Sequence, residues 1–247
     1  MKSLPNEALL QEFNLWLNSA HLQTLPLTRG KKVYFRGVNN ATYPLLPKIA
    51  RPEYNKGLKS EGNIFHKFFT EGAKDIKNLN SWEILFLMRH HGVPTRLLDW
   101  TESFIIALYF ALRKRQTDAD VAIWVLNSDN LCIQNGLSDK NLFNSTTVGF
   151  KYDDFITNDQ ITLLKVVPIQ PTYYHERFIA QSSIFTMHFV LTPLDELYKE
   201  NNVLLKLSLP NKLIPAAEYF LYLNDINEHK LFPDLDGLGS VLENEYF

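Results

Sequence analysis

Apolar residues at the start of the chain recur every three or four positions. This spacing would place them along one side of a helix and leave Asn14 on the polar side, which predicts an amphipathic helix over residues 6–18. The same spacing predicts further helices over residues 61–79, 81–91, 103–112 and 211–228, and a short last helix after the turn at 231–239. Ser81 is the expected N-cap of helix 81–91, because its hydroxyl can accept hydrogen bonds from the first free amides.

Short apolar runs between turn-forming residues predict the strands. They cover residues 33–37, 95–100, 121–126, 164–168, 184–191 and 203–209. Residues 127–160 are polar and contain glycines, which indicates an excursion or a flexible insertion. Because helices come mostly first and strands mostly later, the pattern favours an α+β fold in a single domain. We expect that domain to cover residues 33–247, after an N-terminal helical segment over residues 1–32.

The composition indicates a globular protein. The chain has 247 residues, of which 45% are hydrophobic and 13% aromatic, enough for a packed core. A net charge of −2 excludes the basic surface that tight non-specific binding to nucleic acid needs, although a local basic groove stays open. The single cysteine, Cys132, excludes an internal disulfide and a cysteine-rich zinc site. No apolar run reaches the roughly 18 to 20 residues that span a bilayer, and no signal-peptide pattern begins the chain, so we expect no membrane partner and a cytoplasmic location.

Polar chemistry is concentrated between residues 89 and 101. Two histidines, two arginines, a carboxylate and two hydroxyls fall within these thirteen residues, which then run into the apolar helix 103–112. Gly92 and Pro94 predict a turn before strand 95–100. Polar groups at a strand end beside a helix N-terminus favour an anion-binding pocket. A buried core segment needs no such polar density, so we interpret the stretch as a candidate site.

Two candidates lie at the ends of predicted elements. Arg36, which with Gly37 ends strand 33–37, could hold a diphosphate through its forked guanidinium or could form a structural ion pair. His90 and His91 are adjacent and point about 100° apart on a helix, so at most one should face a site, and we favour His91. A metal site is not expected, because further ligands at a suitable spacing are lacking.

The predicted strand 95–100 carries residues with a binding and a structural interpretation. Thr95 could bind a ribose hydroxyl or serve as a β-branched strand former, and Arg96 could contact phosphate or pair with Asp99. Asp99, Trp100 and Thr101 could line the site. The alternatives are that Asp99 or Thr101 only caps the next helix, for which Ser103 is the third candidate cap, and that Trp100 belongs to the core.

Two later segments complete the set of candidates. Arg177 and Gln181 are four residues apart and would share one face of a helix, where Gln181 could orient a ribose hydroxyl or an acceptor. A glutamine cannot act as a general base, so the sequence leaves the catalytic acid or base unidentified. The basic run 113–115 is interpreted as the solvated end of helix 103–112.

Several of these segments together resemble the FRG-domain family, which is named after a short motif. They are Tyr34-Phe35-Arg36-Gly37, the stretch from Arg89 to Ala111 with its H-G-x-P-T-R-L-L-D-W-T core, Leu45, Pro47 and Arg51, the run Arg177 to Phe185, and the ending Leu231 to Leu238. Together they span roughly residues 33 to 240, so the resemblance would make residues 33–247 an FRG domain. Arg89 departs from the family, which often has glutamine there, and so does Ser183, which stands where the family tends to have glycine.

The family's layout is similar to that of the ADP-ribosyltransferases, and this likeness implies a split β-sheet core that binds NAD as the substrate. Arg36, Thr95, His91 and Gln181 would then be the catalytic positions. Arg36 would hold the diphosphate, Thr95 and His91 the nicotinamide ribose, and Gln181 the reacting region. The NAD-binding set implied by the same likeness is Arg36, Gly37, His91, Thr95, Arg96, Asp99, Trp100 and Thr101.

The resemblance also implies a biological role. Bacterial relatives with such folds include toxins and anti-phage effectors, so we expect an enzyme that modifies a macromolecular acceptor. The acceptor would be a nucleic acid, with mRNA among the candidates, or a protein, and a neutralising antitoxin would be a further partner. Two other classes stay open. One is a non-catalytic nucleotide-binding or sensor module, and the other is a nuclease toxin that uses His90 or His91, against which the lack of paired carboxylates for a metal argues.

Overall fold

The computed structural model describes residues 4–28, 31–54, 59–115, 118–137, 143–144, 149–157, 164–171, 176–199 and 202–246. Its α-helices are α1 (Glu7–Thr28), α3 (Glu61–Glu71), α4 (Ser81–His90), α5 (Phe104–Leu112), α6 (Ser128–Gln134), α7 (Tyr152–Thr157), α8 (Glu176–Ala180), α9 (Leu194–Leu197), α10 (Ile214–Leu223), α11 (Glu228–Leu231) and α12 (Leu235–Tyr246). Short 3₁₀ turns are η1 (Lys48–Ala50), η2 (Pro52–Tyr54) and η3 (Asn211–Leu213). The strands are β1 (Val33–Val38), β2 (Leu97–Thr101), β3 (Val121–Asn127), β4 (Phe143–Asn144), β5 (Val166–Gln170), β6 (Ser183–His188) and β7 (Leu204–Leu209).

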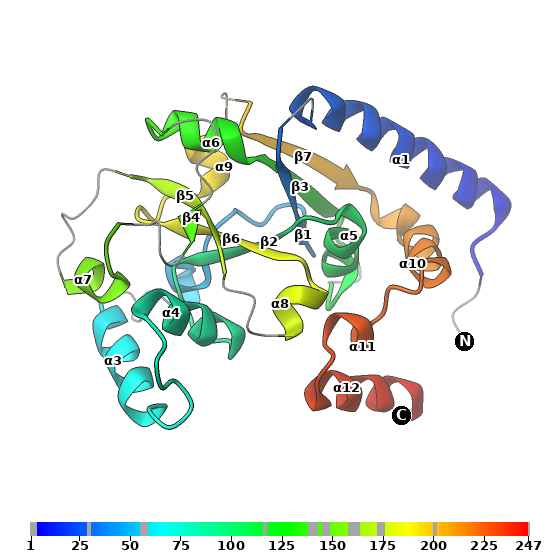
Figure 1. Cartoon of the computed structure of the whole chain (residues 1–247). Coiled ribbons are helices and arrows are strands. Elements are labelled where there is room, and N and C mark those ends of the chain that lie inside the picture. The colour runs from blue at the N-terminus through cyan, green and yellow to red at the C-terminus, as the bar shows by residue number, and fades with distance from the viewer. Residues whose placement is uncertain are drawn as a thin grey trace.

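The strands form one seven-stranded sheet in the order β4-β5-β6-β2-β1-β3-β7 (Figure 1). All neighbouring pairs are antiparallel except β4 and β5, which are parallel. The mixed architecture of helices and strands is therefore confirmed. Strands β3 and β6 are buried over their whole length, as the near-continuous apolar run of β3 leads one to expect for that strand.

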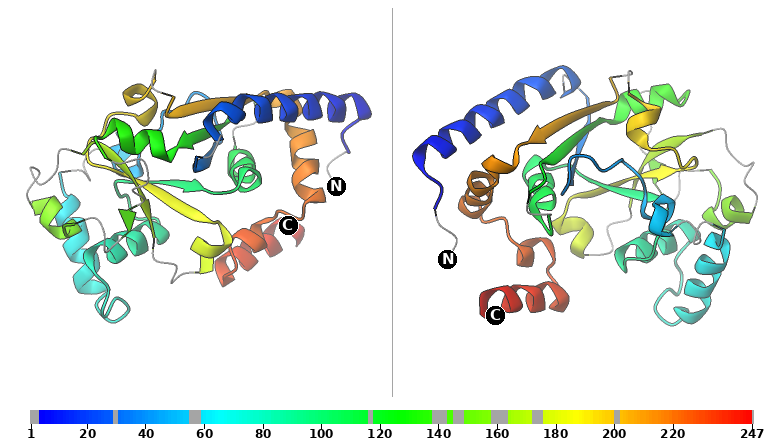
Figure 2. Two further views of the ribbon diagram at one scale, coloured as in Figure 1. Left: turned by 45° about the horizontal axis from the view of Figure 1, so that its top comes forward. Right: turned by 180° about the vertical axis from the view of Figure 1, so that it is seen from behind.

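Helices cover one face of the sheet in two groups (Figure 2). At one end, α1, α5 and α10 pack on β1, β3 and β7 around Ala107, Leu108 and Val125. At the other end, α3, α4 and α7 pack together beside β5 and β6 around Trp82, Phe86 and other aromatic residues. The N-terminal helix α1 thus shares its core with the strands of the sheet.

The helices differ from the sequence prediction at their ends. Helix α1 continues to Thr28, ten residues beyond the predicted end at residue 18, and α3 stops at Glu71 instead of residue 79. The predicted cap Ser81 is wrong, because Asn80 caps α4. Its side chain accepts from the amides of Trp82 and Glu83, and the Glu83 carboxylate accepts from the Asn80 amide in return.

The region predicted as an excursion, residues 127–160, is only partly described. It contains α6, β4 and α7, and α7 packs on α3 and α4. Residues 138–142, 145–148 and 158–160 lie outside the described part of the chain.

Strands β1 and β2 adjoin each other at the centre of the sheet but share a single paired position, Phe35 with Thr101. By contrast, β1 pairs with β3 over six positions and β2 pairs with β6 over five. The two strands are therefore paired only at Phe35 and Thr101. From there they separate, so that Arg36 and Gly37 of β1 lie across a gap from Asp99 of β2. This separation opens the middle of the sheet.

Candidate functional site

A cavity of about 870 Å³ lies where β1 and β2 separate. Consecutive residues of β1 line the cavity, and their side chains alternate between the two faces of the sheet. The cavity therefore reaches through the opening between the strands. Its lining comprises Phe35, Arg36, Gly37, Val38, Asn39, Tyr43, Pro44, Leu46, Arg51, Pro52, Glu53, Arg89, His90, Gly92, Asp99, Trp100, Thr101, Phe110, Arg113, Arg177, Phe178, Gln181, Ser183, Phe185 and Phe232. The size suits a ligand as large as a nucleotide or a dinucleotide.

Two arginines converge on one carboxylate in this cavity. Arg89, from the end of α4, donates to both oxygens of Asp99, with Nε–Oδ1 at 2.9 Å and Nη2–Oδ2 at 2.5 Å. Arg36 of β1 donates from Nη1 to the backbone carbonyl of Asp99 at 2.7 Å, and the same nitrogen lies 3.5 Å from Asp99 Oδ2. The forked contact fixes Asp99, which in turn holds the Arg36 guanidinium across the opening.

The charges in this cluster perturb one another. Burial is the largest cause that lowers the pKa of Arg36, to about 10, and repulsion from Arg51 and Arg89 adds to it. Burial alone would raise the pKa of Asp99, but the positive charges of Arg89 and Arg36 hold it below its usual value. The Nε atom of Arg36 is buried and has no hydrogen-bond partner among the described residues. Arg51 also lines the cavity, so three guanidiniums face it together with the carboxylates of Asp99 and Glu53. Positive charge therefore exceeds negative charge in this group, which favours an anionic ligand.

Thr101 and Gln181 meet at the closed end of the opening. The Thr101 hydroxyl donates to the backbone carbonyl of Gln181 at 2.7 Å and accepts from the Ser103 amide at 3.1 Å. Ser103 caps α5 by accepting from the Ile106 amide at 3.5 Å. The side-chain amide of Gln181 donates from Nε2 to the Leu231 carbonyl at 2.9 Å.

A buried polar chain lies behind the cavity wall. Trp100 is among the residues that line the cavity, and it donates from Nε1 to the Thr186 hydroxyl at 3.0 Å. The same hydroxyl lies 3.0 Å from Nε2 of His188, which is fully buried. Burial is the main cause that lowers the pKa of His188, to about 3, and the charges of Arg36 and Arg96 add to it.

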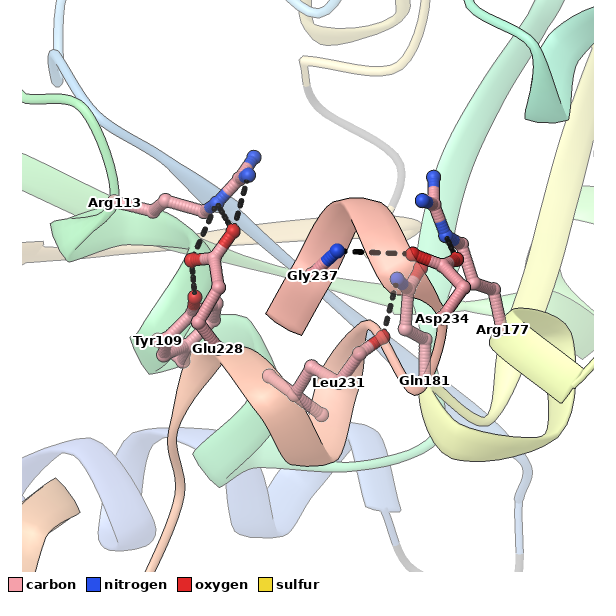
Figure 3. Close-up of polar contacts among 8 residues, drawn as sticks. All are labelled: Tyr109, Arg113, Arg177, Gln181, Glu228, Leu231, Asp234 and Gly237. Carbon is pink, nitrogen blue, oxygen red and sulfur yellow. Dashed lines mark hydrogen bonds and ion pairs between the residues drawn. The ribbon is translucent and has the colours of Figure 1, made fainter. Parts of the chain in front are cut away.

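The C-terminal part of the chain adds Phe232 to the cavity wall. Figure 3 shows the polar contacts that this part of the chain makes with residues of α5 and α8 and with Gln181. Arg113 donates to both carboxylate oxygens of Glu228, with Nη2–Oε1 at 2.6 Å, and Arg177 donates to Asp234. Both guanidiniums lie against the ring of Phe232. The distance from Cζ to the ring centroid is 4.4 Å for Arg113 and 5.2 Å for Arg177. Arg113 was interpreted as part of a solvated helix end, and that interpretation is wrong.

Other predicted residues lie elsewhere. Arg96 neither lines the cavity nor pairs with Asp99, because its Nε donates to both oxygens of Glu61 at 2.9 and 2.7 Å in a buried ion pair. Thr95 is buried outside the cavity and precedes β2, contrary to the strand expected from residue 95. Of the two adjacent histidines, His90 lines the cavity, whereas the favoured His91 is exposed outside it at the end of α4.

Gly37 lines the cavity for a packing reason. A Cβ atom built there would lie 1.9 Å from the carbonyl oxygen of Ala107 and 2.4 Å from the Ala111 amide nitrogen. Only glycine lets β1 approach α5 this closely, and that approach places the neighbouring Arg36 at the opening.

Sequence reasoning assigned no binding role to Arg51 or Arg89. Arg89 is the first residue of the polar stretch that was interpreted as a candidate site, so a signal for it was present. Arg51 was noted only among the residues that resemble the FRG-domain family.

Among the residues that the structure describes, no group of three or more His, Cys, Asp or Glu side chains could hold a metal ion. None of the described helices combines the length and apolar character needed to cross a bilayer.

Comparison with known proteins gives one match. Residues 31–120 match the family model of the FRG domain, so this part of the chain is similar to that family. The match includes Arg36, Arg89 and the β2 residues of the cavity but ends before Gln181 and the C-terminal wall. No curated protein and no solved structure matches the chain.

Proposed function

We propose that the cavity binds the diphosphate of NAD and that the protein transfers ADP-ribose from NAD to a macromolecular acceptor. The observation that carries this proposal is the set of three guanidiniums that line the cavity, Arg36, Arg51 and Arg89, of which Arg36 and Arg89 bind Asp99. A diphosphate offers oxygens in the geometry that guanidinium forks bind well. The opening between two central strands that carry Arg36 and Thr101 supports a split-sheet core of the ADP-ribosyltransferase type.

In this reaction the bond between the nicotinamide nitrogen and the ribose C1′ breaks, and neutral nicotinamide leaves with the bonding electrons. A nucleophilic atom of the acceptor forms the new bond to C1′ and loses its proton to a base. Since the transition state resembles an oxocarbenium ion, the protein contributes mainly orientation and electrostatics. Arg36 would bind the diphosphate, and Gln181 Oε1 would accept a hydrogen bond from a hydroxyl or amide of the nicotinamide riboside.

A second function has one observation in its favour. Among the described residues, the carboxylates that line the cavity are Asp99, which is engaged by two arginines, and Glu53 of η2. Neither lies beside Gln181 in the sheet, and a glutamine cannot take a proton from an acceptor. A module that binds a nucleotide without chemistry would need no such base. The proposed role as a bacterial toxin or anti-phage effector, with an antitoxin as partner, depends on the catalytic reading.

Incubation of the purified protein with NAD and a bacterial lysate tests the proposal. Mass spectrometry would follow released nicotinamide and ADP-ribose added to RNA or protein, and calorimetry would measure NAD binding. We expect Arg36→Ala to weaken NAD binding about 10- to 100-fold, because a charge-assisted hydrogen bond contributes about 1.5–3 kcal/mol. Lys67→Ala is the matched control, because Lys67 is an exposed cation on α3 outside the cavity.

The outcomes separate the two functions. Nicotinamide release that Arg36→Ala reduces and Lys67→Ala preserves would support the transferase. NAD that binds in an Arg36-dependent way but stays intact would favour the nucleotide-binding module. If NAD neither binds nor reacts, both readings of the cavity as an NAD site are wrong.

A further inference from the structure

The segment Glu228–Gly237, which we call the C-terminal clamp, forms one wall of the cavity although it is remote in sequence from β1 and β2. It comprises α11 and the first turn of α12, and it contributes Phe232 to the cavity lining. The clamp makes polar contacts with α5 and α8 (Figure 3).

Glu228 anchors the first end of the clamp. Its carboxylate accepts from Arg113 at both oxygens and from the Tyr109 hydroxyl. Burial alone would raise the pKa of Glu228, but these hydrogen bonds hold it below its usual value, so the group stays charged at neutral pH. The contact therefore ties α11 to the C-terminal end of α5.

Asp234 anchors the second end. One carboxylate oxygen accepts from Arg177, and the other accepts from the Gly237 amide at 3.0 Å, so the residue also caps α12. The hydrogen bond from Arg177 is the main cause that lowers the pKa of Asp234, to about 2. As at Gly37, the backbone at Gly237 approaches another backbone closely. A Cβ atom at Gly237 would lie 1.9 Å from the Phe232 carbonyl oxygen.

The clamp also determines how the side-chain amide of Gln181 is oriented. The Leu231 carbonyl can only accept a hydrogen bond, so the NH₂ group of Gln181 must face it at 2.9 Å. The Oε1 atom is then the free end of the amide and has no hydrogen bond among the described residues. Because Gln181 lines the cavity, this end of the side chain is an acceptor for a ligand donor.

We propose that Glu228 and Asp234 are positioning residues. By docking the clamp on Arg113 and Arg177, they hold the Leu231 carbonyl against Gln181 and fix its Oε1 as an acceptor for a hydroxyl or amide donor of the ligand. The docking itself is independent of the ligand's identity, whereas the effect on turnover rests on the proposed NAD reaction. Arg113 and Arg177 accordingly bind the clamp, whereas Arg36, Arg51 and Arg89 are the arginines proposed to bind the anionic ligand.

Hydrogen–deuterium exchange tests the docking directly. We expect Glu228→Gln and Asp234→Asn each to speed exchange of the peptide covering the clamp about tenfold, the effect of losing a charge-assisted hydrogen bond. Glu243→Gln is the matched control, because Glu243 is an exposed acid on α12 outside the clamp. Unchanged exchange in both single variants would overturn the proposal.

The side-chain amide signal of Gln181 in an NMR spectrum tests the positioning. Its NH₂ protons should be protected from solvent exchange in the native protein and lose that protection in Asp234→Asn. If the signal is unaffected while the clamp opens, the positioning role is wrong.

If NAD is turned over, Asp234→Asn and Gln181→Ala should be non-additive in kcat, since both act through the same amide. Full additivity would also contradict it, and absence of turnover would count against the NAD proposal alone.

Discussion

Replacing His188 with glutamine should make the fold markedly less sensitive to mild acid. The imidazole is fully buried, has Thr186 as its hydrogen-bond partner at Nε2, and has no partner at Nδ1 among the described residues. Burial, with the nearby charges of Arg36 and Arg96, lowers its pKa to about 3. The native protein therefore keeps this side chain neutral across the physiological range. Glutamine is a suitable replacement because its amide can still bond to Thr186.

The sign and size of the effect follow from proton linkage. An unfolded chain binds a proton at this histidine below its ordinary pKa of about 6.5, whereas the folded chain does not until the pH nears 3. Stability is therefore fully present above pH 6.5 and falls as the pH drops, by about 1.4 kcal/mol per pH unit. Between pH 6.5 and pH 5 the native protein should lose about 2 kcal/mol through His188 alone.

Urea unfolding followed by tryptophan fluorescence measures this difference. The native protein should lose about 2 kcal/mol more than His188→Gln when both are moved from pH 7 to pH 5. Equal losses in the two proteins would refute the reasoning. If the variant fails to fold, an NMR titration of His188 in the native protein decides instead. An imidazole that became protonated near pH 6.5 without unfolding would show that the assigned burial is wrong.

Three further substitutions test how the fold supports the site. Glu61→Gln should cost about 3–5 kcal/mol in urea unfolding, because it leaves the buried guanidinium of Arg96 without its counter-charge. Asn80→Ala removes the cap of α4 and should cost about 1 kcal/mol in the same assay, with an unchanged m-value. Gly37→Ala forces a clash with the α5 backbone and should lower the free energy of unfolding by about 3 kcal/mol or more. Gly62→Ala, at an open position on α3, should instead stabilise by up to about 1 kcal/mol, and a loss at that control would refute the packing argument.

The local features of the fold were predictable from the sequence. A near-continuous apolar run identified β3, and a leucine-rich segment ended by Pro210 identified β7. The apolar helix after the polar stretch became α5, with Ser103 as its cap. Arg36 and Gln181 also lie at the cavity as expected. These features depend on residues close together in the chain, so hydrophobic periodicity and capping rules are sufficient to find them.

The pairing of charges was not predictable in the same way. A pair between Arg96 and Asp99 was considered, but residues three apart in a strand point to opposite faces, and the structure places Arg96 against Glu61 instead. Asp99 is reached by Arg89, which depends on the turn after α4 folding back on β2. Likewise, the wall formed by residues 228–237 depends on contacts with residues 50 or more positions earlier.

The single paired position between β1 and β2 has a mechanical consequence. Beyond Phe35 and Thr101 no backbone ladder joins the two halves of the sheet, and the Arg36 guanidinium takes over the bond to the Asp99 carbonyl that a strand amide would otherwise make. Arg36, the side chain proposed to bind the anion, thus also links β1 to β2. A ligand that draws this guanidinium away would weaken the link between the strands β4-β5-β6-β2 and the strands β1-β3-β7. Binding of a ligand in the cavity would therefore change the rigidity of the whole sheet.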